Sequence, residues 1–423
     1  MSKTKVLVFP AGEINAVEIH DALSTCVNIE LYGAASVDRH GGYVYKNYIS
    51  NIPKINESCF IDEFNKLIDQ KQIDVVFPTH DTVALFLSEN RDRIRAKIIV
   101  ADQETTSVCR DKKKIYETFK ECDFCPRTYD DIAEFPVFIK PREGQGGVGA
   151  RLISKTEEIP DVNLGDYVIC EYLPGKEYTV DCFTDRYGHL RAVLPRTRDR
   201  MLAGVTVSSV NIELSDDIRE IAETINSKLR FRGLWWLQLK EDVTGNKKLL
   251  EISTRCAGTM CMARAMGVNL PLLSVYDALD RDIIVEPNNY NIKMDRTLIS
   301  RYKLDYKYST VYFDFDDTLI IDGKVHLPAI SFLYQCRNYG KKVILLTQHE
   351  TDIHEDMKKF SIPESLFDEI IEIDLSDSKS KYIDSSDSIL VDNAYKCRLE
   401  VKEKCNIPVF DVDMLEVLAD WRW

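Results

Sequence analysis

The alternation of apolar and polar positions divides the chain into three blocks, the first at about residues 1–108. A short apolar run at residues 6–9 precedes a helical spacing of Ala16, Ile19 and Leu23, and this alternation continues to the end of the block. Such runs predict strands, and such spacings predict helices. Together they predict a parallel sheet covered by helices, as in a Rossmann-like α/β domain. Because only one glycine follows the first run, NAD or FAD binding is not expected.

The second block, about residues 109–300, contains two predicted strands, 136–141 and 151–153, on either side of a glycine-rich segment. The glycines are Gly144, Gly146, Gly147 and Gly149. Their spacing includes G-x-G-x-x-G, but a dinucleotide loop opens a helix, whereas a strand follows here. An ordinary hairpin turn is the simpler alternative, although it needs fewer glycines. We predict a hairpin whose bare backbone folds over phosphates and donates N–H groups to them.

A second hairpin is predicted near the end of this block, from residues 235–239 and 249–255 around a turn at 244–246. On adjacent antiparallel strands, Gln238 and Glu251 would project from the same face of the sheet. Mg²⁺ accepts carboxylate oxygens together with substrate phosphates. The pair is therefore a candidate metal site.

The third block, about residues 308–423, is a further alternating α/β unit. Its first apolar strand ends in the acids Asp314, Asp316 and Asp317. Carboxylates packed in this way repel one another, and a fold tolerates them readily when a cation joins them. An exposed acidic turn is the alternative interpretation. It is disfavoured because later strands also end in polar groups, at Thr347 and at residues 392–393.

Charge and cysteine usage narrow the classes of function. The chain has 55 Lys and Arg against 69 Asp and Glu, a formal charge of −14, which argues against nucleic-acid partners and against an anionic membrane surface. No apolar stretch approaches eighteen residues and no signal-peptide pattern opens the chain, so we expect a cytoplasmic protein. The twelve cysteines are scattered, and the close pair Cys122 and Cys125 lacks zinc partners, which indicates reduced thiols.

Residues 168–181, VICEYLPGKEYTVD, resemble the hinge and ribose segment of ATP-grasp enzymes, particularly the carbamoyl-phosphate-synthase-like branch. The resemblance covers about residues 1–300. It implies a pre-ATP-grasp domain over 1–108 and an ATP-grasp domain over 109–300, with a lid subdomain at about 128–175. It also implies ATP and Mg²⁺ as cofactors.

The same resemblance assigns roles to single residues. It implies that Lys112 and Lys140 bind the phosphates together with the glycine flap of Gly144, Gly146 and Gly147. It implies that Glu171 and Leu173 mark the adenine segment and that Glu177 takes the ribose hydroxyls. The metal ligands that it implies are Gln238, Glu251 and Ser253.

The last strand of this block departs from the family pattern at one position. The family commonly has E-x-N-x-R, whereas this chain has Glu251, Ser253 and Arg255. A hydroxyl in place of the amide weakens the metal site. The sequence therefore does not decide whether the protein turns ATP over. Arg255 is the candidate for neutralising developing negative charge. The arginines at 196, 198 and 200 suit an acidic substrate, and a solvated loop is the equal alternative.

Motifs in the third block resemble those of haloacid-dehalogenase-like (HAD) phosphatases, over about residues 308–423. The resemblance implies that Asp314 is the nucleophile and that Asp316 is the general acid and base. Thr347 and Lys379 would hold phosphoryl oxygens, with Lys381 as the alternative lysine. Asp314, Asp316 (through its carbonyl) and Asp392 would hold Mg²⁺. Asn393 stands where a second acid is frequent.

The spacing of these motifs leaves no room for a cap domain. Only 28 residues separate Thr318 from Thr347, and 31 separate Thr347 from Lys379. The predicted fold class is thus α/β and α+β, with a Rossmann-like pre-ATP-grasp domain, an ATP-grasp domain and a capless HAD-like Rossmannoid domain.

The function expected from both resemblances is an ATP-dependent carboxylate–amine ligase fused to an Mg²⁺-dependent phosphatase. The ligase would form an acyl phosphate, and the phosphatase an aspartyl phosphate. The expected partners are a small carboxylate, a nucleophile and a phosphate ester, without nucleic acid or membrane, and a homo-oligomer is compatible with the sequence. The alternative is an ATP-binding sensor or scaffold in which only the phosphatase is active.

Overall fold

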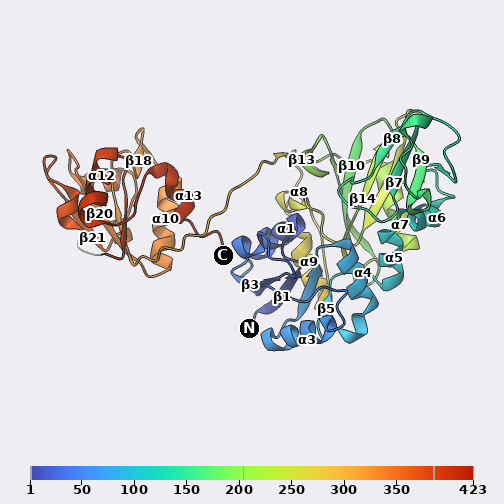
Figure 1. Ribbon diagram of the computed structural model, residues 1–423, viewed down its shortest axis with the longest axis horizontal. Coiled ribbons are helices and arrows are strands. Elements are labelled where there is room, and N and C mark those ends of the chain that lie inside the picture. Colours follow the sequence, from blue (N-terminus) through green and yellow to red (C-terminus); the bar gives the residue numbers. More distant parts are fainter. Residues whose placement is uncertain (1, 203, 384–385, 423) are drawn as a thin grey trace. The chain divides into compact units, whose positions relative to one another are not determined.

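The computed structural model describes residues 2–202, 204–383 and 386–422. The chain forms two compact units, which we call unit 1, up to residue 298, and unit 2, from residue 299 (Figure 1). The predicted boundary near residue 108 lies inside unit 1 and stays a prediction. Within the described residues, no helix combines the length and the apolar character needed to cross a membrane.

Unit 1 begins with the predicted parallel sheet, whose strand order is β3-β2-β1-β4-β5. Its strands are β1 (Thr4–Phe9), β2 (Ile29–Ala34), β3 (Asn47–Ile49), β4 (Val75–Pro78) and β5 (Lys97–Ile98). Its helices are α1 (Ile14–Leu23), α2 (Gly41–Val44), α3 (Phe60–Lys71) and α4 (Asp81–Glu89). Figure 1 shows α3 on one side of the sheet and α1 on the other.

Alternate residues of β1 enter different cores, as expected for a strand covered on both faces. Val6 and Val8 pack in one core with Ile19 of α1, and Leu7 and Phe9 pack in the other with aromatic residues of α3. This double burial explains why the strand reads as a continuous apolar run.

The remainder of unit 1 contains three antiparallel sheets. The flap sheet, in the order β6-β9-β7-β8, has β6 (Thr128–Tyr129), β7 (Val137–Pro141), β8 (Arg151–Ile153) and β9 (Tyr167–Glu171). The central sheet, in the order β11-β10-β14-β15, has β10 (Glu177–Thr184), β11 (Leu190–Thr197), β14 (Gly233–Glu241) and β15 (Lys247–Ser253). The third sheet has β12 (Arg200–Leu202), β13 (Val205–Val210) and β16 (Lys293–Asp295).

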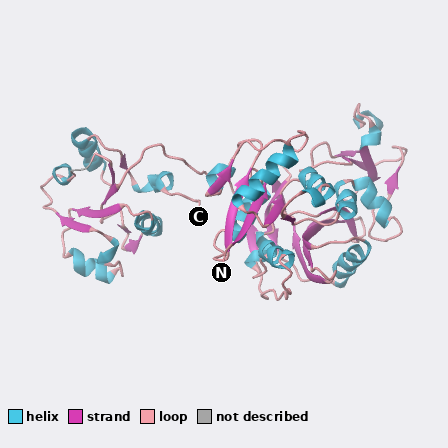
Figure 2. Cartoon of the chain, turned by 90° about the horizontal axis from the view of Figure 1, so that it is seen from below, coloured by secondary structure: helices cyan, strands magenta, loops and turns pink. Residues whose placement is uncertain are grey.

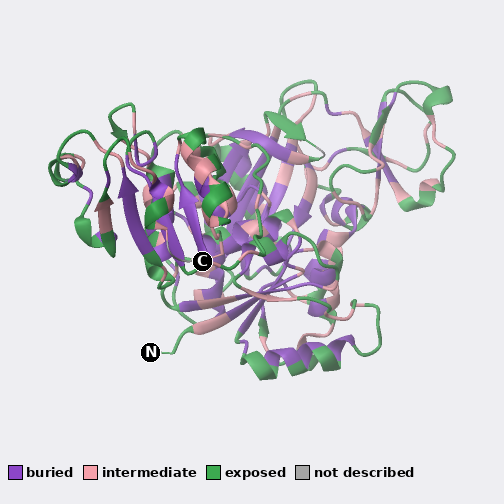
Figure 3. Cartoon of the chain, turned by 60° about the vertical axis from the view of Figure 1, so that its left-hand side comes forward, coloured by how far each residue is buried: buried purple, intermediate pink, exposed green. Residues whose placement is uncertain are grey.

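Five helices accompany these sheets: α5 (Gln103–Arg110), α6 (Lys112–Phe119), α7 (Asp216–Lys228), α8 (Cys261–Ala265) and α9 (Leu270–Ala278). One face of the central sheet packs on α5, α6 and α7, with Trp235 fully buried and stacked on Phe231 at 4.0 Å between ring centroids. The other face shares its core with α1 and β1 of the parallel sheet. Figure 3 shows the strands largely buried, whereas the helices carry exposed outer faces.

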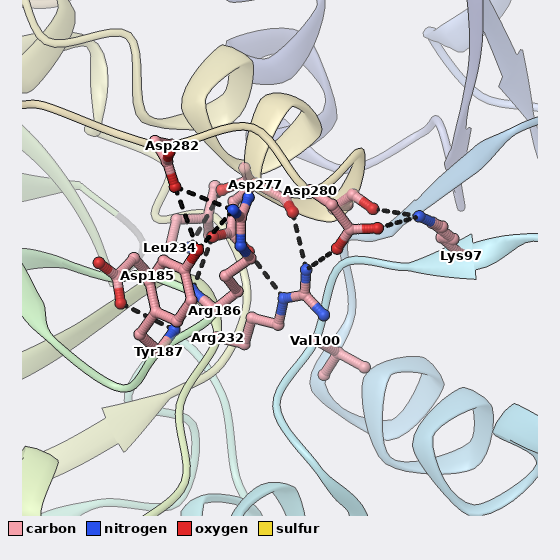
Figure 4. A network of polar contacts seen from close by, with 12 residues as sticks. Lys97, Val100, Asp185, Arg186, Tyr187, Arg232, Leu234, Asp277, Asp280 and Asp282 are labelled. Atoms are coloured by element: carbon pink, nitrogen blue, oxygen red, sulfur yellow. Dashed lines mark hydrogen bonds and ion pairs between the residues drawn. The ribbon is translucent and has the colours of Figure 1, made fainter.

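A charged network joins the edge of the parallel sheet to the central sheet (Figure 4). Arg232, just before β14, donates to the Asp277 carboxylate at 2.7 Å and pairs with Asp280 at 3.2 Å. Lys97 of β5 lies 3.4 Å from the other oxygen of the Asp280 carboxylate. Because the carboxylate of Asp277 is almost fully buried, these contacts fix α9 between the two sheets.

Unit 2 is a five-stranded parallel sheet in the order β21-β20-β17-β22-β23, as the alternation of its sequence predicts. The strands are β17 (Thr310–Phe313), β20 (Lys342–Thr347), β21 (Glu369–Glu372), β22 (Ser388–Val391) and β23 (Val409–Phe410), and a hairpin is formed by β18 (Ile320–Ile321) and β19 (Lys324–Val325). The helices are α10 (Leu327–Asn338), α11 (Ile353–Lys359), α12 (Tyr395–Cys405) and α13 (Leu415–Leu418). They lie on both faces of the strands (Figure 2).

Candidate active sites

The first candidate site is a cavity of about 350 Å³ between the flap sheet and the central sheet of unit 1. Residues of the predicted ATP site line it: Lys112, Lys140, Gly144, Gly146, Gly147, Glu171, Leu173, Glu177, Gln238 and Glu251. We call it the nucleotide cavity. The fold thus gathers side chains that are spread over about 140 positions of the sequence.

The glycine-rich segment is the tip of an antiparallel hairpin, as predicted, because β7 pairs with β8 on either side of it. Gly146, Gly147 and Gly149 have φ values of 60°, 72° and 77°, which side chains disfavour. A Cβ on Gly149 would lie 2.9 Å from the side chain of Pro141. A Cβ on Gly204 would lie only 2.0 Å from the carbonyl oxygen of Gly146, so the tip packs directly against that loop.

Two lysine ammonium groups reach the nucleotide cavity. The Nζ of Lys140 donates to the carbonyl of Leu250 at 3.0 Å, and burial lowers the pKa of this lysine. The Nζ of Lys112 lies 3.3 Å from the carbonyl oxygen of Gly144 and 3.6 Å from Oε2 of Glu251. Positive charge with little competing solvent suits a polyphosphate.

The two other acidic residues of the cavity have local partners. Glu171 accepts hydrogen bonds from the backbone N–H of Arg127 at 2.9 Å and from its Nε at 3.2 Å. Glu177 lies 2.9 Å from Nε of Arg198 and 3.9 Å from Nζ of Lys240. A ribose hydroxyl would therefore compete with Arg198 for the Glu177 carboxylate.

The candidate metal ligands are separated by the structure. Gln238 and Glu251 stand directly opposite each other on β14 and β15 and both line the cavity. Ser253 does not line it, because its hydroxyl donates to Oδ1 of Asp81 at 2.8 Å. The structure therefore places the Ser253 hydroxyl on Asp81 rather than in the cavity with Gln238 and Glu251, and the three-residue metal set stays a prediction.

One carboxylate and one amide oxygen beside two lysines fit an Mg²⁺ ion that takes its other ligands from phosphates. Within the described ranges, no group of three or more His, Cys, Asp and Glu side chains is arranged to hold a metal ion. A metal at Gln238 and Glu251 would accordingly depend on the nucleotide for much of its coordination.

Asp81, the first residue of α4, is a site residue that sequence reasoning missed. Arg255 lies 3.0 Å from each oxygen of the Asp81 carboxylate, and Gln145 in the glycine-rich tip donates to it at 2.8 Å. Burial raises the pKa of Asp81, but Arg255 and Ser253 more than offset this and lower it below its usual value. No local sequence pattern indicates a role for Asp81, because its partner Ser253 is 172 positions away in the sequence.

A second cavity of about 270 Å³ adjoins the first, and we call it the acceptor cavity. On one side it borders the start of α1 and Thr79, which follows β4. On the other side it borders the central sheet, and Arg255 lines it. The residues that line both cavities are Gln145, Gly146, Arg198, Gly204, Gln238 and Glu251. A second molecule in the acceptor cavity would thus meet the phosphate end of a nucleotide at the Gln238–Glu251 pair.

The three neighbouring arginines do not form one solvated loop. Arg196, on β11, is fully buried and pairs with Asp181 at 2.9 Å. Arg198 borders both cavities, and Arg200, on β12, is exposed and pairs with Asp295 at 2.8 Å. Of these three arginines, Arg196 and Arg198 line the acceptor cavity and Arg200 does not.

The second candidate site lies at the carboxyl ends of β17 and β22 in unit 2. The Nζ of Lys379 donates to Oδ1 of Asp314 at 2.6 Å and to Oδ2 of Asp392 at 2.7 Å. Burial raises the pKa of Asp314, and Lys379 opposes this only in part. Two buried carboxylates that share one ammonium fit the binding of a further cation such as Mg²⁺.

Neighbouring hydroxyl groups complete this second site. Thr318 donates to Oδ2 of Asp314 at 3.2 Å and also lies 3.2 Å from Oδ1 of Asn393. The hydroxyl of Thr347, at the end of β20, is buried and has no hydrogen-bond partner among the described residues. A buried hydroxyl without a partner is costly, and a bound phosphoryl oxygen would supply one.

The structure distinguishes the two candidate lysines. Lys381 has an exposed side chain and pairs with Asp377, whereas Lys379 is buried between the two carboxylates. Asp316 is half exposed and its carboxylate binds His349, at 2.7 Å between Oδ2 and Nδ1. The connection from Thr318 to Thr347 contains the β18–β19 hairpin and α10, and the connection from Thr347 to Lys379 contains α11 and β21.

Comparison with known proteins supports the ATP-grasp assignment of unit 1. Residues 163–299 match a family described as ATP-grasp in the biosynthetic pathway with Ter operon. A 3-methyl-D-ornithine–L-lysine ligase of Methanosarcina acetivorans is 27% identical over an alignment of 244 residues that covers 55% of this chain. The chain spans 64% of the length of that relative.

Several solved structures share the fold of unit 1. The biotin carboxylase domain of Hydrogenobacter thermophilus 2-oxoglutarate carboxylase, in complex with MgADP, has a TM-score of 0.57 at 16% identity, covering 69% of this chain and 74% of its own. The L-amino acid ligase of Bacillus licheniformis has a TM-score of 0.53 at 14% identity, covering 66% and 74%. ATP-grasp enzymes use ATP and Mg²⁺, in agreement with the cofactors expected from the sequence. These matches show that residues 163–299 fit the ATP-grasp family model and that unit 1 shares a mixed α/β fold with the solved structures.

Proposed function

We propose that unit 1 is an ATP-dependent ligase that activates a carboxylate as an acyl phosphate and joins it to an amine. The observation that carries this proposal is the meeting of the nucleotide cavity and the acceptor cavity at Gln238 and Glu251. The names of two similar proteins, a 3-methyl-D-ornithine–L-lysine ligase and an L-amino acid ligase, favour amino acids as substrates.

In the first step, a carboxylate oxygen of the substrate attacks the γ-phosphorus of ATP, an O–P bond forms, and the bond to the β-phosphate oxygen breaks. Lys112 and Lys140 bind phosphate oxygens, and the glycine-rich tip excludes water from them. Mg²⁺ held by Glu251 and Gln238 would neutralise phosphate charge. Arg255, which faces the acceptor cavity, stabilises charge on the acyl group.

In the second step, the amine nitrogen attacks the acyl carbon, the C–N bond forms, and the C–O bond to phosphate breaks. The amine loses one proton, and inorganic phosphate leaves. Both cavities are bordered by the same glycine-rich tip, because Gly146 lines each of them. Shielding of the acyl phosphate from water favours the amine over hydrolysis.

The test of this function is product formation. Purified protein is incubated with ATP, Mg²⁺ and a pool of amino acids, ADP is measured, and joined products are sought by mass spectrometry. We expect ADP together with a mass equal to two amino acids minus water. ADP without any joined product would count against a ligase.

An ATP-binding sensor is the second candidate function of unit 1, and one observation favours it. Ser253 is bound to Asp81 and does not face the nucleotide cavity, so the metal site has few protein ligands. Calorimetry with ATP and Mg²⁺ separates the two functions when it is combined with product analysis. Binding without ADP formation would support the sensor.

For unit 2 we propose an Mg²⁺-dependent phosphatase of the HAD-like type. The Asp314–Lys379–Asp392 cluster carries this proposal. An oxygen of Asp314 attacks the phosphorus of a phosphate ester, the ester O–P bond breaks, and Asp316 protonates the leaving oxygen. Water then attacks the aspartyl phosphate, with Asp316 accepting its proton, and Asp314 is restored.

The phosphatase is tested with p-nitrophenyl phosphate and Mg²⁺. We expect hydrolysis that EDTA abolishes and that the substitution Asp314→Asn removes. Hydrolysis that persists in Asp314→Asn would contradict the assigned nucleophile. The matched control is Asp317→Asn, since Asp317 is exposed in the adjacent turn.

A further inference from the structure

The carboxylate of Asp316 in unit 2 is held by a histidine that the sequence motifs did not single out. Nδ1 of His349 lies 2.7 Å from Oδ2 of Asp316, and Nε2 of the same ring lies 2.9 Å from Oδ2 of Asp356. The hydroxyl of Thr351 lies 2.9 Å from Nε2 and donates to Oδ2 of Asp356 at 2.7 Å. The imidazole therefore bridges the site to the first turn of α11.

The position of this ring is fixed from several sides. The His349 side chain is only 7% exposed, whereas that of Asp316 is 51% exposed. Its ring lies edge-on to Phe315, with centroids 5.2 Å apart. The outer carboxylate, Asp356, is in turn 3.4 Å from Nζ of Lys359. The half-exposed Asp316 is thus tied to a buried ring, and each ring nitrogen lies within 3 Å of a carboxylate oxygen.

We infer that His349 is a positioning residue, which holds the Asp316 carboxyl group where it transfers protons during phosphate ester hydrolysis. This inference rests on the phosphatase function proposed for unit 2. An exposed aspartate samples several rotamers, and a reacting group is most effective when its geometry is fixed in advance. The bond from Nε2 to Asp356 fixes the ring, and the ring fixes Asp316.

The role of Asp316 differs between the two steps, and this provides a selective measurement. In the first step Asp316 gives its proton to the leaving oxygen as the ester O–P bond breaks. This help matters when the leaving group is a strong base and little when it is a weak one. Since kcat/KM reports only the steps through the first irreversible one, it isolates this transfer.

The experiment compares full-length wild-type protein with His349→Phe, using phenyl phosphate and p-nitrophenyl phosphate. Phenolate is a strong base and p-nitrophenolate a weak one. We expect kcat/KM for phenyl phosphate to fall by about a hundredfold, and kcat/KM for p-nitrophenyl phosphate to fall by less than about fivefold. His349→Gln keeps a donor for Asp316 and should recover part of the loss with phenyl phosphate.

The matched control is His354→Gln, because His354 also contacts a carboxylate at 2.8 Å but is exposed and pairs with Glu364 instead of Asp316. Both substrates should be unaffected in this control. If His349→Phe does not fold, Asp356→Asn tests the same chain of contacts and should show the same selective loss on a smaller scale.

Three results would overturn the inference. An equal loss with both substrates would assign His349 a structural role only, and no loss with either would remove any role. Wild-type protein that hydrolyses neither ester would overturn the proposed phosphatase and this inference with it. In the first two cases the wild-type protein still hydrolyses the esters. Failure of the His349 inference can therefore be distinguished from failure of the proposed phosphatase function.

Discussion

At the scale of single residues, unit 1 contains charged side chains that are largely shielded from water and that contact several partners. Asp81 is the clearest case, because one carboxylate contacts Ser253 and Arg255 at the end of β15 and Gln145 in the glycine-rich tip. Its side chain is only 19% exposed and that of Arg255 only 16%. Removal of one partner from a buried ion pair is far more costly than loss of an exposed pair.

We therefore expect Asp81→Asn to destabilise unit 1 by about 2–4 kcal/mol, because the buried charge of Arg255 loses its counterion while the shape is kept. Urea unfolding measures this change. The control is Asp102→Asn at the start of α5, where the carboxylate accepts a hydrogen bond from the Thr105 N–H at 2.8 Å. Asn caps helices as well as Asp does, so less than about 0.5 kcal/mol is expected there. Equal stability of Asp81→Asn and the wild type would refute the paired role.

Glu18 on α1 predicts a pH dependence of stability. Burial, opposed in part by Arg264 at 3.3 Å, raises the pKa of Glu18 from 4.5 to about 7. Between these values the folded state binds a proton that the unfolded state has lost. The stabilising contribution is therefore full below about pH 4.5 and is lost as the pH rises through 7, an effect of about 3 kcal/mol at most.

In Glu18→Gln this titration is absent. Relative to the variant, the wild type should lose about 2–3 kcal/mol of unfolding free energy between pH 5 and pH 8. Denaturant unfolding across this range provides the measurement. Glu63→Gln on α3, an exposed residue paired with Lys66, is the control and should change stability by less than about 1 kcal/mol at each pH. A constant difference between wild type and Glu18→Gln would contradict the raised pKa.

At the scale of elements, sequence pattern predicted the strands that are buried on both faces. The predicted run 6–9 lies within β1, and the polar groups predicted to end later strands, at Asp314, Thr347 and residues 392–393, fall at the ends of β17, β20 and β22. The short strand β3 was missed, because its three residues, Asn47–Ile49, are half-buried and only one of them is aliphatic. The alternation of apolar and polar residues indicates which positions are buried, and the residues of β3 are only half-buried.

The candidate sites show the same limit. The hairpins that carry the glycines and the Gln238–Glu251 pair followed from local spacing, and the structure places these residues together. Asp81 and His349 could not be found in this way, since they act through contacts with residues 172 and 33 positions away. The choice between Lys379 and Lys381 also needed coordinates, because both are compatible with the spacing of the motifs.

The glycine-rich hairpin makes a prediction at this scale. Gly149 has a φ of 77°, and a methyl group there would meet Pro141, so Gly149→Ala should displace the flap from the phosphates. We expect kcat/KM for ATP to fall at least about tenfold, with most of the change in KM. Gly188→Ala, at φ 84° with no neighbouring atoms within 4 Å, carries the same backbone strain away from the site. It should leave ATP kinetics unchanged, and similar effects of both variants would refute a specific role of the flap.

At the scale of the whole molecule, two units with separate hydrophobic cores carry two separate candidate sites. The nucleotide and acceptor cavities are lined by unit 1 alone, and the Asp314 cluster is formed by unit 2 alone. Each unit therefore contains all the residues that its proposed reaction uses. This division makes the two proposed activities separable by single substitutions.

We expect Asp314→Asn to lower p-nitrophenyl phosphate hydrolysis by at least about a thousandfold and to change ATP-dependent ligation by less than about twofold. Glu251→Gln should abolish ATP-dependent ligation and leave p-nitrophenyl phosphate hydrolysis unchanged. Both activities are measured on the same full-length preparations, so that differences in folding are visible in the unaffected activity. Loss of both activities in either variant would contradict the independence of the two sites.

The central claim is that unit 1 transfers the γ-phosphoryl group of ATP to a carboxylate, and trapping of the acyl phosphate tests it most directly. Protein, ATP and Mg²⁺ are incubated with a pool of amino acids and with hydroxylamine, which converts an acyl phosphate to a stable hydroxamate. We predict hydroxamate in proportion to ADP in the wild type, and neither product in Glu251→Gln. ADP without hydroxamate, or hydroxamate formation that Glu251→Gln leaves unchanged, would contradict the account.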